Sequence, residues 1–179
     1  MSGSLVKIQE VTVTSSTASV SLTGIDTTYD VYKLIINNLV PSADDAPLFR
    51  VTKSGVAQAD ANYDYATFYH KSDTSSQILS GTNGTGRDIM AKLDDASGHA
   101  GGNGNGVYYL YNFPNASGYS YVTMESSHFQ ASVHNVRGFN GGFVHTVASA
   151  CDGVNIQFNN YSSGSTIESG TFRLYGLKK

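Results

Sequence analysis

The sequence predicts an all-β protein, an antiparallel sandwich of two β-sheets of the jelly-roll kind. The first observation is composition: charged residues make up only 14% of the chain, and 19 glycines accompany many Ser, Thr and Asn residues. The second is a period-two alternation of apolar and polar residues, which is typical of strands with one buried face. The third is the spacing of turn residues, roughly every dozen positions, with no strand–helix alternation.

The last segment of the chain carries the clearest alternation. Thr171, Arg173 and Tyr175 fall on one face of the expected strand, and Phe172 and Leu174 fall on the other. We therefore expect a closing strand that fills a place in one of the sheets.

In the first part of the chain, Val, Ile and Tyr favour strands over helices. The run from Val31 to Ile36 is the most apolar and is the candidate for the centre of a sheet. A short helical turn is expected at 58–62. The strands expected in this part are residues 5–13, 18–22, 29–38, 48–53 and 63–70.

The middle of the chain, residues 72–106, is expected to be a loop-rich insertion because Ser, Thr and Gly dominate it. Within it, 87–93 is a candidate strand. The glycine run 98–106 invites comparison with phosphate-binding loops. Neither a following helix nor a terminal Lys-Ser/Thr pair is present, so the run predicts a plain exposed loop.

Clear strand patterns resume after residue 106. Segments 107–113 and 119–125 are expected to form a hairpin, and 126–142 is expected to be a loop with a strand fragment around Phe129. No linker divides the sequence, so we expect one sandwich domain over residues 1–179. The remaining expected strands are residues 143–148, 154–158 and 166–175.

Charge and apolar patterning exclude several classes of partner. The net charge is −3 and no basic stripe is present, so nucleic acid is not an expected partner. No apolar run has the length of a signal peptide core or a membrane span, so neither export nor membrane insertion is expected. Cys151 is the single cysteine, which excludes an intrachain disulfide and suits a small buried side chain.

No pattern of catalytic or metal-binding residues emerges. The C-terminal histidines match no zinc spacing, and the adjacent aspartates do not guarantee carboxylates that face one another across a substrate. No Gly-x-Ser-x-Gly elbow supports a serine nucleophile. We therefore expect no enzyme activity, metal or cofactor. The residues considered are His128, His134 and His145, and the pairs Asp44-Asp45 and Asp94-Asp95.

Tyrosines are more informative, since 12 of them occur in this chain. Several occupy adjacent strand positions, so they cannot all point inward. A tyrosine offers apolar area and one hydroxyl, which suits subunit contacts and sugar stacking as well as cross-strand pairing. The candidate interface or ligand contacts are Tyr63, Tyr65, Tyr69, Tyr109, Tyr111, Tyr119 and Tyr121.

Three stretches carry a family resemblance. They are SGSLVKIQEVTV (2–13) with LTGIDTTYDVY (22–32), FRVTKSG (49–55) with NYD (62–64), and HTVASA (145–150) with SGTFRLYGLK (169–178). Together they resemble small virion proteins encoded by marine tailed phages, including those of cyanobacteria. The resemblance spans nearly the whole chain and departs most in the middle.

The resemblance implies a virion structural protein, a tail-fibre or head-decoration component made in the host cytoplasm. Its expected partners are other virion proteins and copies of itself, with a trimer favoured. Two alternatives stay open: a receptor-binding module that recognises host glycan through Tyr and Asp/Asn side chains on loops such as 94–106, and a polysaccharide depolymerase with a carboxylate pair. The family carries no binding residue across.

Overall fold

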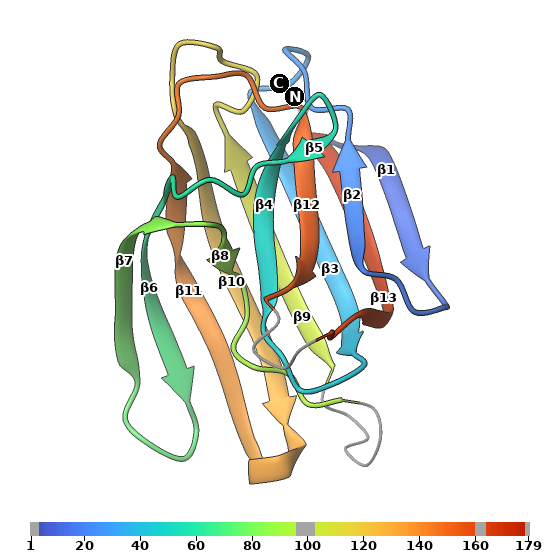
Figure 1. Cartoon of the computed structure of the whole chain (residues 1–179), viewed down its shortest axis with the longest axis vertical. Coiled ribbons are helices and arrows are strands. Elements are labelled where there is room, and N and C mark those ends of the chain that lie inside the picture. Colours follow the sequence, from blue (N-terminus) through green and yellow to red (C-terminus); the bar gives the residue numbers. More distant parts are fainter. Residues whose placement is uncertain (1–3, 96–102, 160–163, 178–179) are drawn as a thin grey trace.

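A computed structural model describes residues 4–95, 103–159 and 164–177. Two antiparallel sheets lie face to face, with the smaller sheet in front of part of the larger one (Figure 1). This arrangement confirms the predicted all-β sandwich. No helix within the described residues is long and apolar enough to span a membrane.

The larger sheet has eight strands and includes both the first and the last strand of the chain. Consecutive strands β9, β10 and β11 form a meander at its centre. Its strands, in spatial order, are β1 (Leu5–Val13), β13 (Ile167–Leu177), β3 (Val31–Pro41), β9 (Gly104–Tyr111), β10 (Ser120–Gln130), β11 (Asn135–His145), β6 (Tyr63–Lys71) and β7 (Gln77–Gly84).

The smaller sheet has five strands and covers only one face of the larger sheet, here called the inner face. Strand β12 lies at its centre and pairs with β2 on one side and β4 on the other. Its strands are β2 (Ser19–Thr23), β12 (Gly153–Phe158), β4 (Pro47–Lys53) and β5 (Val56–Ala57), with β8 (Arg87–Asp88) paired to β4.

The core lies between the two sheets and is built by alternate residues of the facing strands. The rings of Phe49 on β4 and Phe143 on β11 meet edge to face across the sandwich, with centroids 5.0 Å apart. Burying a side chain of this size contributes about 1.5–3 kcal/mol. Other fully buried members of the core include Tyr32, Leu34, Tyr108, Phe158, Phe172 and Leu174.

The closing strand has the alternation that the sequence predicts. Phe172 and Leu174 on β13 are fully buried, whereas Thr171, Arg173 and Tyr175 are half-buried on the opposite face. Strand β13 lies between β1 and β3, so both of its edges are paired. It is therefore an interior strand of the larger sheet.

Two expected loops are strands in the structure. Within 72–106, residues 77–84 form the edge strand β7, although their composition resembles a turn region. Between 126 and 142, β10 continues to Gln130 and β11 begins at Asn135, and the two are joined by the single 3-10 turn η1 (Ala131–Val133). Strand β11 ends at His145, before the end of the strand expected at 143–148.

Two smaller expectations also differ from the structure. Residues 58–62 form bends without helical structure, and only Arg87 and Asp88 of the expected strand 87–93 are in a strand. Leu93 instead exchanges backbone hydrogen bonds with Asp45. Part of the expected glycine loop, residues 98–102, lies outside the described residues, and β9 begins within its remainder at Gly104.

Candidate functional site

The outer face of the larger sheet is the face opposite the smaller sheet. Along β10, the even-numbered residues are buried and the odd-numbered residues are exposed on this outer face. The registers of β9, β11 and β6 with β10 extend the same outer face across the sheet. The described strands belong to the two sheets, and the smaller sheet lies on the inner face (Figure 1).

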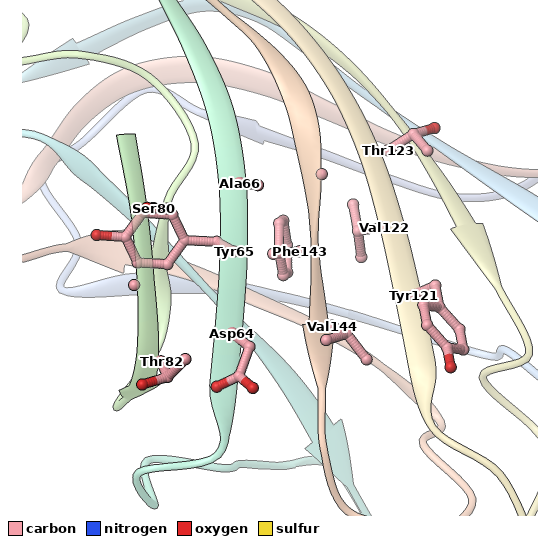
Figure 2. A pocket seen from close by; sticks show the side chains of 12 residues that line it. Asp64, Tyr65, Ala66, Ser80, Thr82, Tyr121, Val122, Thr123, Phe143 and Val144 are labelled. Atoms are coloured by element: carbon pink, nitrogen blue, oxygen red, sulfur yellow. The ribbon is translucent and has the colours of Figure 1, made fainter. Parts of the chain in front are cut away.

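A continuous trough runs along β10 and β11 on the outer face. A hollow of about 650 Å³ lies over Ala66 and Gly142, and a second of about 500 Å³ shares Thr123 with it. A third hollow of about 220 Å³ shares Glu125 and Asn140 with the second. Figure 2 shows the first hollow, with Tyr121 and Thr123 on the β10 side and Ser80 and Thr82 on the β7 side.

The floor of the trough is made by glycines of β11. A Cβ atom on Gly138 would lie 2.5 Å from the carbonyl oxygen of Ser126, and one on Gly142 would lie 2.7 Å from that of Val122. Such contacts cannot form without separating β10 from β11, so neither position tolerates a side chain. The glycines therefore fix the depth of the trough by backbone packing.

The walls of the trough combine aromatic rings with polar side chains. Tyr121 on β10 is directly opposite Tyr111 on β9, and its side chain is 49% exposed. The Lys33 ammonium lies 5.2 Å from the centre of the Tyr109 ring, a cation–π contact that orients this ring beside the second hollow. Glu125 and Asn140 face each other across the β10–β11 pair.

The seven tyrosines selected from the sequence divide into two groups. Tyr109, Tyr111 and Tyr121 lie on the outer face, and Tyr119 is exposed in the turn before β10. Of these four, Tyr109 and Tyr121 line the trough.

Tyr63 belongs to the core and has no access to a partner. Its side chain is fully buried, and its hydroxyl donates to the Gln58 carbonyl at 2.9 Å and accepts from the Val51 N–H at 3.1 Å. Burial raises the pKa of the Tyr63 hydroxyl, so this group stays protonated.

Tyr65 and Tyr69 point to the inner face. The Arg87 guanidinium stacks 3.9 Å from the centre of the Tyr65 ring, and Tyr69 meets Phe139 edge to face at 5.1 Å. Both rings therefore take part in packing between β6, β8 and β11. Burial also raises the pKa of the Tyr69 hydroxyl.

The histidines considered from the sequence do not converge on a common site. His128 and His145 are buried at separate ends of the β10–β11 pair, and His134 is exposed after η1. Burial lowers the pKa of His128 to about 4 and also lowers that of His145. Among the described residues, no group of three His, Cys, Asp or Glu side chains could hold a metal ion.

The paired aspartates join loops to the sandwich. Asp94 accepts hydrogen bonds from Gln130 Nε2 at 3.2 Å and from the Ser132 N–H at 2.9 Å. Asp44 accepts one from the Asp95 N–H and lies 3.3 Å from Lys92 Nζ. Asp94 is buried in this network, and residues 96–102 of the loop expected as a glycan contact lie outside the described residues.

Cys151 is a buried, weakly polar member of the core, as the sequence predicts. Its thiol lies 3.7 Å from the Ser149 carbonyl, and burial raises the pKa of the thiol. A protonated, buried thiol is a poor nucleophile. The site residues that the sequence did not reveal are Lys33, Thr123, Glu125, Asn140 and the glycines of β11.

Comparisons with known proteins do not indicate a function. No protein-family model matches the sequence, and no curated protein matches it. One structural similarity is to a fructofuranosidase from Schwanniomyces occidentalis complexed with fructosylnystose, at 9% identity and a TM-score of 0.26. The alignment covers 98% of this chain but only 34% of that structure, and a similarity of this size carries no argument about fold or function.

Proposed function

We propose that this chain is a non-enzymatic bacteriophage virion protein, a tail-fibre or head-decoration component that self-associates and docks on other virion proteins. The resemblance of its three motif-bearing stretches to virion proteins of marine tailed phages supports the virion role. Self-association is supported by a single structural observation, the contrast between the two edges of the larger sheet.

The edge formed by β1 carries features that prevent strand pairing with another chain. Glu10 Oε2 lies 2.9 Å from Lys7 Nζ and 3.3 Å from Arg173 Nε. The register with β13 also shifts between Lys7 and Gln9. Charged side chains and bulges both oppose pairing between edge strands, so β1 is a protected edge.

The edge formed by β7 lacks the charged side chains of β1, and its register with β6 shifts only near its end, where Tyr63 pairs with Gly84 and Tyr65 with Gly81. Residues Gln77–Gly84 contain no charged residue and no proline. Ile78 is 76% exposed on this strand, directly opposite Phe68 of β6, which is 41% exposed. A long edge strand with exposed apolar side chains is a site for strand addition.

The partner proposed for β7 is the β7 strand of a second copy. Two identical edges each supply an apolar Ile78–Phe68 pair and no charge, so pairing buries apolar surface without desolvating an ion. An antiparallel contact between identical edges is isologous and closes at two copies. We therefore expect a dimer through this edge in place of the trimer expected from the sequence.

Light scattering after size-exclusion chromatography tests the dimer. Ile78→Lys places a charge at the proposed contact and is expected to give a monomer at concentrations where the wild type is dimeric. Val56→Lys is the matched control, because Val56 is 64% exposed on β5 of the smaller sheet. A wild type that is monomeric at all concentrations, or equal dissociation of both variants, would contradict the proposed contact.

Docking on the particle is tested separately. Labelled wild-type chain is mixed with purified head and tail preparations of a phage that encodes it, and co-sedimentation is measured. We expect retention on one of the two preparations. A chain that sediments with neither, and that mass spectrometry does not find in the purified particle, would overturn the virion role.

A further inference from the structure

The trough has dimensions that suit an elongated ligand. Its two larger hollows, of about 650 and 500 Å³, each fall within the range of small-molecule sites, and they join at Thr123. The floor is backbone whose hydrogen bonds are already made between β10, β11 and β6. A ligand therefore meets a surface formed before binding, which lowers the entropic cost of association.

The walls present both apolar and hydrogen-bonding groups. Tyr121 offers an exposed ring beside the first hollow, and Tyr109 offers a ring beside the second. Tyrosine rings pack against apolar ligand faces while their hydroxyls donate or accept hydrogen bonds. A ligand that fits both hollows thus needs apolar faces as well as polar edges.

Three polar side chains of the second hollow are available to a ligand. Within the described chain, Glu125 and Asn140 take part in none of the side-chain hydrogen bonds or ion pairs, and Lys33 makes a cation–π contact with the Tyr109 ring. Together they offer a carboxylate acceptor, an amide that donates and accepts, and an ammonium donor. Such a set matches a ligand rich in hydroxyl groups.

Charge and geometry disfavour the other elongated ligands. In the two larger hollows, Lys33 is opposed by Glu125 and Asp64, so a phosphate chain there would meet more negative than positive charge. An acyl chain would desolvate these polar groups without replacing their hydrogen bonds. An extended peptide that binds by strand addition needs a strand edge, whereas the trough lies on a sheet face.

We infer that the trough is a binding site for an uncharged saccharide chain. The C–H faces of successive sugar rings would lie against Tyr121 and Tyr109, and their hydroxyls would bond to Glu125, Asn140 and Lys33. This binding function goes beyond the self-association proposed above and does not depend on it. It uses Tyr109 and Tyr121, which are candidate ligand contacts from the sequence, together with polar side chains of the outer face.

Isothermal titration calorimetry with defined oligosaccharides tests the site. The probes are neutral hexasaccharides of glucose, mannose, galactose and N-acetylglucosamine, with an oligogalacturonate as the anionic comparison. We expect at least one neutral probe to bind the wild type, and Tyr121→Ala to weaken that binding roughly tenfold, the factor that corresponds to about 1.4 kcal/mol. Tyr175→Ala is the matched control, since Tyr175 lies on the same sheet face outside the trough.

A variant that fills the first hollow tests whether binding needs the space of the trough as well as its wall contacts. Ala66 is exposed on the floor of the first hollow, so Ala66→Phe is expected to fold normally and to abolish binding while leaving every polar wall residue in place. Circular dichroism verifies the fold of each variant.

Three results would overturn the saccharide site. They are no binding of any neutral probe, unchanged binding by Ala66→Phe, and preferential binding of the anionic probe. Measuring both properties in both variants distinguishes the saccharide site from the β7 dimer. Ala66→Phe is expected to remain dimeric, and Ile78→Lys is expected to retain saccharide binding. A dimer lost in Ala66→Phe would show that the trough holds a second copy instead.

Discussion

Buried polar side chains of β10 couple the stability of the sandwich to pH. His128 Nε2 donates to the Lys92 carbonyl at 3.1 Å, and burial lowers the pKa of His128 from 6.5 to about 4. Between pH 6.5 and about 4, the His128 imidazole is therefore protonated in the unfolded chain and neutral in the folded chain. Stability from this group is complete above pH 6.5 and is lost as the pH falls toward 4.

His128→Gln tests this coupling. Glutamine does not titrate in this range and retains an N–H donor for the Lys92 carbonyl. Between pH 6.5 and 4.5 we expect the unfolding free energy of the wild type to fall more steeply than that of the variant, by a difference of about 2 kcal/mol. Urea unfolding at several pH values measures the difference, and parallel curves for both proteins would contradict the assignment.

Arg87 is a second buried polar residue with a defined environment. Its guanidinium stacks on Tyr65 at 3.9 Å, lies 5.2 Å from the Phe139 ring, and donates from Nη2 to Thr67 Oγ1 at 2.7 Å. Arg87→Lys keeps the charge but loses the planar stacking group, so we expect a loss of roughly 1–3 kcal/mol. Arg50→Lys, at a half-buried site, is the control and is expected to lose less than about 1 kcal/mol. Equal losses in urea unfolding would argue against stacking as the cause.

At the scale of strands, the glycines of β11 determine how closely β10 approaches. A Cβ atom on Gly138 would meet the Ser126 carbonyl oxygen at 2.5 Å, so Gly138→Ala is expected to cost roughly 1–3 kcal/mol of unfolding free energy. Asn140→Ala on the same strand face already has a Cβ atom and is expected to change stability little. Thermal melts of the two variants measure the contrast, and equal melting temperatures would count against the close approach.

Strand β13 is required because neighbours pair with both of its edges. A chain lacking residues 169–179 would leave β1 and β3 without their shared partner and would remove the buried Phe172 and Leu174. We expect no cooperative thermal transition and no soluble folded protein. A truncated chain that melts at the wild-type temperature would show that the sheet does not need this strand.

Strands with regular apolar alternation were predictable, and strands with polar inner residues were not. Phe172 and Leu174 identify β13 because its buried face is apolar. On β10, the inner residues Ser126, His128 and Gln130 are polar and buried, so the apolar alternation is missing. Their burial is made possible by hydrogen bonds to the distant Lys92–Asp94 segment, which local sequence patterns do not reveal.

The candidate site was predictable only in part for a similar reason. Alternation indicates that some tyrosines must face outward, and Tyr109 and Tyr121 do so. Which tyrosines face inward depends on strand register, and Tyr63 is buried by the pairing of β6 with β11. The glycines of β11 resemble turn residues in sequence, and only the packing of β10 against β11 reveals them as the floor of a trough.

For the whole molecule, the pairing of β1 with β13 places Leu5 opposite Leu177. The chain must therefore close a loop of nearly its full length, and folding by such distant contacts is slow, in the range of milliseconds to seconds. Figure 1 shows β1 and β13, the first and last strands described, beside each other.

A circular permutant tests the cost of this closure. Linking the present ends by a short flexible segment and opening the chain between Ala59 and Asp60, which are both exposed, makes β13 and β1 a local pair. We expect the permutant to retain the fold and to refold faster than the wild type in stopped-flow experiments. Slower refolding with unchanged stability would indicate that another contact limits the rate.

Alternation along a strand has one more consequence for an assembly joined through β7. An antiparallel partner continues the same sheet, so the outer faces of both copies point in the same direction. The two saccharide troughs would then face the same surface. Binding of a polymer in the first trough would raise the effective concentration of that polymer at the second trough. Avidity of this kind strengthens weak individual contacts by about 10²–10⁴ without any new interaction, which suits recognition of a repetitive polymer on a cell.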